Sequence, residues 1–163
     1  MVYLNLAKNK IKSLQLFTNE EYFPNLKWLD VSSNKYTELP AIKLPRLEYL
    51  DISYNKIEKI NEGWHGHGNI RIFKSIDNKF KNLAPFKTMP KLEELYLGGN
   101  VVASLSGWES LPELKKLHLR RNKIEKIDEE LPGLDKLVYL NLRANKLSTL
   151  EQVEKIFAAF PTI

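Results

Sequence analysis

The sequence predicts an α/β repeat protein in which about seven short coils stack, so that one strand from each coil joins a parallel sheet along one wall. Two observations support this fold class. Residues 92–105 are written again at residues 114–127, with six apolar and asparagine positions repeating at one offset of 22 residues. The same pattern recurs around further asparagines spaced 21 to 25 residues apart. A period in this range is typical of solenoids, whose repeats pack against their neighbours.

Each repeat has the alternation L-x-x-L-x-L before its asparagine. The L-x-L part predicts a short strand whose apolar side chains point inward while the flanking side chains point outward. The asparagine follows where the chain turns off the strand. Its carboxamide can donate and accept hydrogen bonds at once, and so can satisfy backbone groups of adjacent coils. We therefore expect a structural ladder of Asn9, Asn34, Asn55, Asn78, Asn100, Asn122 and Asn145.

The fourth repeat and the connectors add detail to this pattern. The fourth repeat places Ser75 where the other six repeats have an inward aliphatic residue. In the connectors, a second apolar position stands fourteen residues before four of the asparagines. We expect the side chains at this position to fill the convex side of the solenoid, because a periodic apolar position is what a stacked core requires. They are Trp64, Phe86, Trp108 and Leu131.

The C-terminal residues predict a short helix. Ser148 and Glu151 have the spacing of a capping box, in which each residue caps the other's backbone. A stripe of apolar residues follows at helical spacing: Leu150, Val153, Phe157 and Phe160. Residues 160–163 then repeat the entry to a strand. We therefore expect residues 1–163 to be a single repeat domain that is a fragment of a longer solenoid.

The composition limits the classes of protein. With 163 residues, 43% of them apolar, and no long uncharged apolar run, the chain is predicted to form one soluble domain without a membrane segment. The absence of cysteine, of a leader and of an Asn-x-Ser/Thr acceptor favours an intracellular, cytoplasmic location. The net charge of +5 is spread evenly, which permits nucleic-acid binding without indicating it.

The form L-x-x-L-x-L-x-x-N-x-I-x-x-I at 22-residue spacing resembles the intracellular 22-residue class of leucine-rich repeats. Residues 89–145 look most like the axonemal radial-spoke leucine-rich-repeat proteins. The resemblance implies a right-handed βα solenoid with short helical or extended connectors on its convex face. It also implies a docking platform, in the cytoplasm or in the axoneme of a cilium. The class includes a phosphatase regulatory subunit and a splicing-particle protein, which supply two alternative functions.

Equivalent outward positions of stacked strands lie about 4.8 Å apart and form columns on the concave wall. The first three repeats place an aromatic row there, beside two aspartates, and the sixth and seventh repeats place a basic zone. An exposed aromatic row is typical of interaction hot spots. The alternative is cross-strand aromatic pairing that only stabilises the sheet. The expected partner-binding residues are Tyr3, Trp28, Asp30, Tyr49, Asp51, Tyr54, Tyr96, Lys116, His118, Arg120, Arg121, Tyr139 and Arg143.

The basic zone predicts an acidic partner. Like charges on neighbouring strands cost stability unless an acidic group pairs with them. Glu94 beside Lys116 can neutralise only one of these charges. We expect a protein partner with an acidic or helical segment. RNA or another phosphate is the alternative, since Tyr96, Tyr139 and the arginines could stack on it and pair with it.

The sequence shows no site for catalysis. It contains no glycine-rich phosphate loop, no cysteine nucleophile and no nucleophile elbow. His65 and His67 have no third ligand in view, so a zinc site is not expected. Asp30 and Asp51 lie on an open sheet, and with Lys74 next in their column they predict an ion-pair ladder. We expect no enzyme activity, no cofactor, no metal and no small-molecule substrate.

Three functions follow. The first is a non-catalytic scaffold that binds partner segments on its concave face, with an axonemal or ciliary role implied by the resemblance. The second is a regulatory subunit of a protein phosphatase, which should co-purify with phosphatase activity. The third is a component of a ribonucleoprotein, which should bind labelled RNA at physiological salt.

Overall fold

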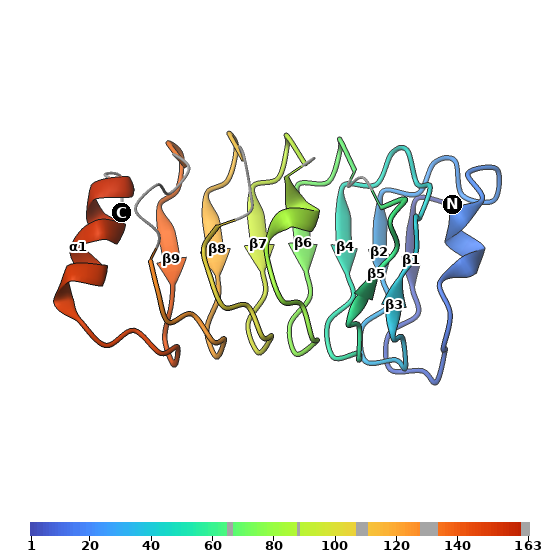
Figure 1. Cartoon of the computed structure of the whole chain (residues 1–163). Coiled ribbons are helices and arrows are strands. Elements are labelled where there is room, and N and C mark those ends of the chain that lie inside the picture. The colour runs from blue at the N-terminus through green and yellow to red at the C-terminus, as the bar shows by residue number, and fades with distance from the viewer. Residues whose placement is uncertain (65–66, 88, 107–110, 128–133, 161–163) are drawn as a thin grey trace.

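The computed structural model describes residues 1–64, 67–87, 89–106, 111–127 and 134–160. It is a solenoid in which seven short parallel strands form one sheet in the order β1-β2-β4-β6-β7-β8-β9 (Figure 1). We number the coils 1 to 7 by these strands. The strands are β1 Tyr3–Asn5, β2 Trp28–Asp30, β4 Tyr49–Asp51, β6 Ile72–Lys74, β7 Glu94–Tyr96, β8 Lys116–His118 and β9 Tyr139–Asn141. The predicted fold class is confirmed.

The strands pair in strict register, residue on equivalent residue. The middle residue of each strand points into the core, and the two outer residues face the concave side. In β2, for example, Leu29 is buried while Trp28 and Asp30 are only half-buried. The apolar alternation sets this register, because a slip by one residue would turn every inward side chain to the solvent.

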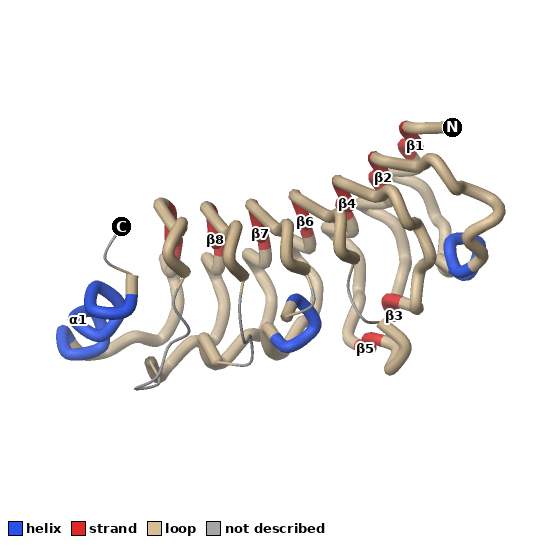
Figure 2. The backbone as a smooth tube through the Cα atoms, turned by 90° about the horizontal axis from the view of Figure 1, so that it is seen from above, coloured by secondary structure: helices blue, strands red, loops and turns tan. Residues whose placement is uncertain are grey.

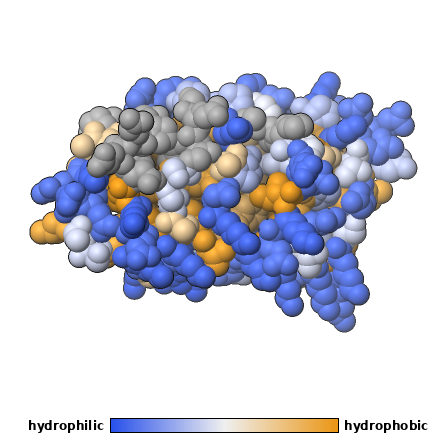
Figure 3. Space-filling model, viewed as in Figure 1, coloured by the Kyte–Doolittle hydropathy of each residue, from blue (hydrophilic) through white to orange (hydrophobic). Residues whose placement is uncertain are grey.

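The convex wall is built from extended and 3-10 segments. Two short strands, β3 Glu38–Leu39 and β5 Lys59–Ile60, pair there, opposite the main sheet (Figure 2). The 3-10 helices are η1 Gln15–Thr18 and η2 Ala84–Phe86. Trp64 and Phe86 are buried as predicted, whereas Trp108 and Leu131 lie outside the described residues. Figure 3 shows hydrophilic residues on this side with apolar residues between them.

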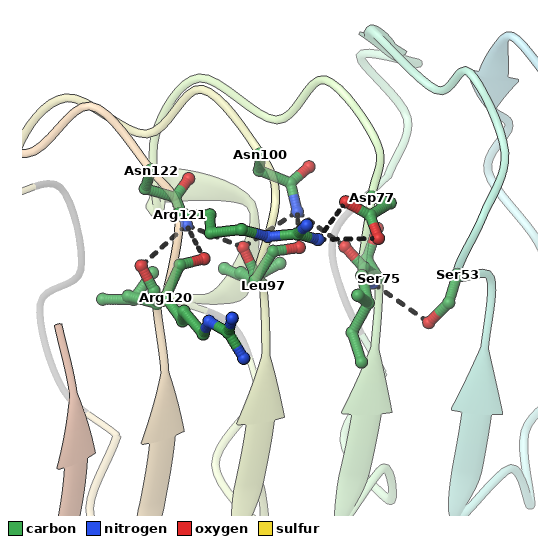
Figure 4. A network of polar contacts seen from close by, with 11 residues as sticks. Ser53, Ser75, Asp77, Leu97, Asn100, Arg120, Arg121 and Asn122 are labelled. Atoms are coloured by element: carbon green, nitrogen blue, oxygen red, sulfur yellow. Dashed lines mark hydrogen bonds and ion pairs between the residues drawn. The ribbon is translucent and has the colours of Figure 1, made fainter. Parts of the chain in front are cut away.

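The asparagine carboxamide joins each coil to the one before it. Asn100 Oδ1 accepts a hydrogen bond from the backbone N–H of Phe80 at 2.9 Å. Its Nδ2 donates to the carbonyls of Ser75 in the preceding coil at 2.6 Å and Leu97 in its own coil at 2.9 Å (Figure 4). Both kinds of contact with the preceding coil recur at Asn34, Asn55, Asn78, Asn122 and Asn145. The predicted ladder is confirmed for six of the seven asparagines.

Ser75 keeps the irregular fourth coil in register. It is fully buried at the inward position, where the other coils carry an aliphatic side chain. Its hydroxyl accepts a hydrogen bond from Asn78 Nδ2 at 3.0 Å. In the preceding coil, the buried Ser53 hydroxyl accepts from the backbone N–H of Ile76 at 3.0 Å. The two buried hydroxyls are therefore satisfied, as burial of a polar group requires.

The residue before each asparagine adopts a left-handed conformation in all seven coils. These residues are Lys8, Ser33, Tyr54, Asp77, Gly99, Arg121 and Ala144, with φ between 51° and 69°. A left-handed non-glycine residue costs roughly 1–2 kcal/mol, so the bonds of the following asparagine hold the turn against that cost. At Gly99 a Cβ would collide with the Asp77 carboxylate.

The missing side chain at Gly99 lets a contact form between non-adjacent coils. Arg121 Nη2 of coil 6 reaches over coil 5 and donates to both carboxylate oxygens of Asp77 in coil 4, at 2.7 and 3.0 Å (Figure 4). The pair is separated by 44 residues in the sequence. It therefore ties next-nearest neighbours in a fold whose other contacts run mainly between adjacent coils.

The C-terminal helix forms as predicted, but with a different cap. Helix α1, Leu150–Ala159, is capped by Thr149 and Gln152, one residue later than the predicted pair Ser148 and Glu151. The buried residues here are Ile156 and Phe160. Leu150 is 80% exposed and Phe157 is 59% exposed, so the predicted apolar stripe is wrong at these two positions.

The structure describes no helix that is both long and apolar enough to cross a bilayer. Residues 161–163, which contain most of the expected start of a further repeat, lie outside the described residues.

Asn100→Ala or Asn122→Ala should each lower the free energy of unfolding by about 1–3 kcal/mol, because backbone groups of two coils lose their partner. Urea denaturation measures this loss. Asn9→Ala is the matched control and should cost less. The Asn9 carboxamide is exposed and its hydrogen bonds go to the carbonyls of Leu6 and Ala7 in its own coil. Unchanged midpoints for both buried variants would contradict the role of the ladder.

Tyr36→Phe should stabilise the protein. The Tyr36 side chain is 1% exposed, and its hydroxyl has no hydrogen-bond partner among the described residues. Burial raises the pKa of Tyr36 to about 12. Removing an unsatisfied buried hydroxyl should raise the free energy of unfolding by about 1 kcal/mol, which thermal denaturation can detect. Tyr22→Phe, at a 60% exposed position, is the control and should change the melting temperature little. A less stable Tyr36→Phe variant would disprove this reading.

Candidate partner-binding face

The outward residues of the seven strands form the columns that the sequence predicts. The first column consists of the first residue of each strand, and there Tyr3 lies opposite Trp28 and Trp28 opposite Tyr49. The third column consists of the last residue of each strand, and there Asn5 lies opposite Asp30 and Asp30 opposite Asp51. The register continues unchanged to β9. The predicted residues at these positions are therefore brought onto one face.

The N-terminal part of this face is an aromatic stack. The rings of Tyr3 and Trp28 lie 3.9 Å apart at 14°, and those of Trp28 and Tyr49 lie 4.8 Å apart at 6°. Tyr3 is 56% exposed, while Trp28 and Tyr49 are half-buried by their neighbours. The stack therefore stabilises the sheet and is also accessible along its ring edges.

The stack continues across the whole sheet, which sequence reasoning missed. The Lys74 ammonium lies 5.3 Å from the centre of the Tyr49 ring and 5.4 Å from that of Tyr96. Tyr96 then stacks with His118 at 5.9 Å, and His118 with Tyr139 at 6.2 Å. We call this set the stacked row; it takes one residue from every coil: Tyr3, Trp28, Tyr49, Lys74, Tyr96, His118 and Tyr139.

The predicted ion-pair ladder from Asp30 through Asp51 to Lys74 is wrong. Asp30 and Asp51 each accept a hydrogen bond from the backbone N–H two residues later, at 2.9 Å. Asp51 also accepts from the Tyr49 hydroxyl at 3.3 Å. Burial, and then the charge of Asp51, raise the pKa of Tyr49. Lys74 instead lies over the two tyrosine rings, where its cation meets their negative faces.

The basic zone is partly neutralised within the protein. Lys116 forms the predicted ion pair with Glu94 at 2.9 Å, and Arg121 is held by Asp77 at 2.7 Å. Burial opposes ionisation of Glu94, yet hydrogen bonds from Lys116 and Tyr96 lower its pKa. Arg120 and Arg143 are exposed, and their guanidinium groups have no hydrogen-bond or ion-pair partner within the described part of the chain. These two side chains are therefore the cations available to a ligand.

His118 contributes no positive charge at neutral pH. Asn141 Oδ1 accepts from the backbone N–H of Arg143 at 3.0 Å, which turns Asn141 Nδ2 toward His118 Nε2 at 3.3 Å. His118 Nε2 must then accept, so the proton of the neutral ring is on Nδ1. Burial, and then the charge of Arg120, lower the pKa of His118.

A ladder of alternating charge borders the face just before the strands. Lys27 pairs with Glu48 at 2.8 Å; Glu93 pairs with Arg71 at 2.6 Å and with Lys115 at 2.9 Å. Hydrogen bonds from Lys115 and Arg71 lower the pKa of Glu93. The spacings of 21 and 22 residues between these partners match the repeat period. That match was the signal in the sequence that could have revealed the ladder.

A hollow of about 390 Å³ lies between this ladder and the first column of the sheet. Trp28, Tyr49 and Ile72 form its apolar wall. A second hollow, of about 270 Å³, lies at the other end of the strands and is lined by Tyr54, Ile76 and Arg120 among others. Tyr54 is 54% exposed at this rim, as its predicted role in binding requires.

The structure adds no support for metal or acid–base chemistry. Within the described residues, no group of three or more His, Cys, Asp or Glu side chains could hold a metal ion. His65 lies outside those residues. His67 Nε2 is buried, with no hydrogen-bond partner in the part of the chain that the structure describes. Burial, opposed by a backbone hydrogen bond to Ile42, lowers the pKa of His67 to about 4.

The stability of the protein should fall as the pH drops from 6.5 toward about 4. His67 stays neutral in the folded chain over that interval, while the unfolded chain takes up a proton. The contribution of His67 to the free energy of unfolding is therefore fully present above pH 6.5 and is lost as the pH falls toward about 4. His67→Phe should reduce the loss between pH 6.5 and 5, above the range in which carboxylates titrate. The depressed pKa of His118 leaves a remainder. Urea midpoints measured against pH test this; an identical decline in the variant would refute it.

Comparison with known proteins identifies the repeat. The family profile described as "Leucine Rich repeats (2 copies)" matches residues 24–63 and 112–155, together just over half of the chain. "Leucine-rich repeat-containing protein 23" of Xenopus tropicalis is 41% identical over 56 residues, 34% of this chain and 16% of that protein. Its namesake from Bos taurus is 37% identical over 62 residues, 38% of this chain and 18% of that protein. The chain thus spans less than a fifth of the length of these relatives.

Solved structures share the architecture. "YopM from Yersinia enterocolitica WA-314" superposes with a TM-score of 0.71 at 28% identity, over 91% of this chain and 30% of that chain. The "TLR13-ssRNA13 complex" superposes with a TM-score of 0.80 at 27% identity, over 99% of this chain and 24% of that chain. Profile, relatives and fold agree, and the protein belongs to the leucine-rich-repeat family.

Proposed function

We propose that the protein is a non-catalytic interaction scaffold that binds segments of other proteins on its concave face. The observation that carries this proposal is the stacked row, an uninterrupted line of side chains across all seven strands. Beside it lie two arginines, Arg120 and Arg143, that have no partner among the residues that the structure describes. Repeat proteins generally bind along their concave surface. Aromatic and arginine side chains are those in which interface energy concentrates.

The geometry of the rings favours a polypeptide over RNA. Trp28 has Tyr3 against one face and Tyr49 against the other, and His118 lies in the same way between Tyr96 and Tyr139. Bases bind single-strand proteins by stacking on free ring faces, and these faces are already covered. The edges that remain carry partial positive charge, which suits the carboxylates and backbone carbonyls of an acidic segment.

RNA binding is the second candidate. The similar TLR13 structure is described as a complex with single-stranded RNA, and Arg120 and Arg143 could pair with phosphate. A role of the present chain as a ribonucleoprotein component would rest on these arginines rather than on the rings.

We place the scaffold inside the cell, in the axoneme of a cilium. The absence of cysteine and the resemblance of residues 89–145 to radial-spoke leucine-rich-repeat proteins support this location. The similarity to leucine-rich repeat-containing protein 23 covers about a third of the chain. Immunofluorescence of the tagged full-length protein against an axonemal marker would test the location.

Trp28→Ala combined with Arg120→Glu should lower the recovery of protein partners at least tenfold, since two hot-spot contacts of about 1–2 kcal/mol each are lost. Affinity purification followed by quantitative mass spectrometry measures recovery. Tyr22→Ala combined with Lys59→Glu is the matched control. It makes the same kinds of change at exposed residues away from the concave sheet, and should leave recovery unchanged.

Equal recovery by the wild type and the concave variant would sink the proposal. A labelled 20-nucleotide RNA that shifts at physiological salt, and is released by Arg120→Glu, would favour the ribonucleoprotein function instead. Phosphatase activity that co-purifies with both variants would point to binding outside the concave face.

A further inference from the structure

The hollow of about 390 Å³ lies where the stacked row changes column, at coil 4. Through the first three coils the row runs along the first column, as Tyr3, Trp28 and Tyr49. At coil 4 it continues through Lys74 in the third column. The first column there holds Ile72, whose side chain is shorter than a ring. A step is left beside the outer edge of Tyr49, and Ile72 forms its floor.

The rim of this hollow is charged but internally paired. Lys27 and Glu48 form one ion pair across it, and Arg71 and Glu93 form another. The remaining charged lining residue, Glu94, is paired with Lys116. A charged group of a ligand would have to break one of these ion pairs to find a partner of opposite charge. An apolar group needs only to displace water from Trp28, Tyr49 and Ile72, which is favourable. The volume lies at the small end of the range for ligand pockets, which fits one or two large side chains.

The unpaired cations lie at a fixed offset from the hollow. Arg120 is in coil 6, about two and a half coils along the solenoid. In register it lies four residues further along the strand direction than Ile72, whose equivalent in coil 6 is Lys116. At about 4.8 Å per coil and 3.3 Å per residue, the separation is roughly 18 Å. Arg143 continues the same line into coil 7. Guanidinium groups bind carboxylates through paired hydrogen bonds.

We infer that one bulky apolar side chain of an acidic partner segment is anchored in the hollow of Trp28, Tyr49 and Ile72, while carboxylates of the same segment bind Arg120 and Arg143. This inference rests on the proposed function and adds the chemistry of the ligand. Tyr96 and His118 lie between the hollow and the arginines. Their positive ring edges oppose neither the apolar side chain nor the carboxylates of such a segment. An offset of about 18 Å corresponds to about five or six residues of extended chain, or about twelve of helix.

Selection of displayed peptides tests this directly. Random 16-residue peptides are panned on the full chain, and the enriched peptides are synthesised and titrated by fluorescence anisotropy. We expect enriched peptides to pair a large apolar residue with an acidic one at the spacing given above. Ile72→Lys should weaken their binding at least tenfold. Ile72→Trp, which fills the hollow without adding charge, should do the same.

Two further variants separate the parts of the inference. Arg120→Glu combined with Arg143→Glu should also weaken binding at least tenfold. It should reverse the salt dependence, because salt then screens a repulsion in place of an attraction. Ile60→Lys is the matched control for Ile72→Lys, because Ile60 is a half-buried strand residue on the convex wall, and should leave the affinity unchanged. Circular dichroism of each variant shows whether the fold is retained.

The outcomes distinguish this inference from the proposed function. Peptides that lose affinity with the arginine variant but bind both Ile72 variants as the wild type would overturn the anchor site, while leaving a concave scaffold intact. Enriched peptides without an apolar residue would overturn it as well. Peptides unaffected by any concave variant would overturn the anchor site and the proposed function together.

Discussion

The carboxamide of one asparagine per coil is the constraint on which the rest of the structure depends. Each bond from the asparagine to the preceding coil satisfies a backbone group that would otherwise be buried without a partner. Such groups are expensive to leave unpaired in a core. Because the carboxamide has a fixed shape, it also fixes the offset between coils. Together with the apolar alternation, this offset fixes the strict register of the seven strands, and with it the columns of the concave face.

Stacking in register is what makes the concave face large enough to bind a partner. Each strand contributes only three residues, so no single coil has enough area to bind a partner. Stacked in register, the coils bring rings within contact distance and form the stacked row. The same alignment neutralises most of the charge along the edge of the sheet. What remains for a ligand is an apolar step at coil 4 and two arginines at coils 6 and 7.

The period of the sequence was sufficient to predict the strands, the asparagine ladder and the members of each column. These features depend on spacing alone, which a repeat displays directly. The path of the stacked row was not predictable in the same way. It depends on whether the flexible Lys74 side chain turns toward Asp51 or toward the rings of Tyr49 and Tyr96. That choice is made by side-chain conformation and neighbouring charges, which spacing does not encode.

The C-terminal cap shows a second limit. Ser148 with Glu151 and Thr149 with Gln152 are equally good capping pairs in sequence. The structure selects the second pair, in which Gln152 Nε2 also donates to the carbonyl of Glu125 at 2.5 Å in the preceding coil. A tertiary contact therefore decides between two local alternatives. In the helix that begins at this cap, Ile156 is buried and Phe157 is exposed.

The bridge from Arg121 over Gly99 to Asp77 has a consequence for how the solenoid comes apart. An array coupled only between adjacent units frays from its ends one unit at a time. Here the loss of coil 6 also releases a contact with coil 4, so coils 4 to 6 are coupled as a block. An exposed pair of this kind contributes only about 0–1 kcal/mol. The pair nonetheless couples coils that are not adjacent. Coils 4 to 6 are therefore more strongly coupled to one another than coils in an array with contacts between adjacent coils alone.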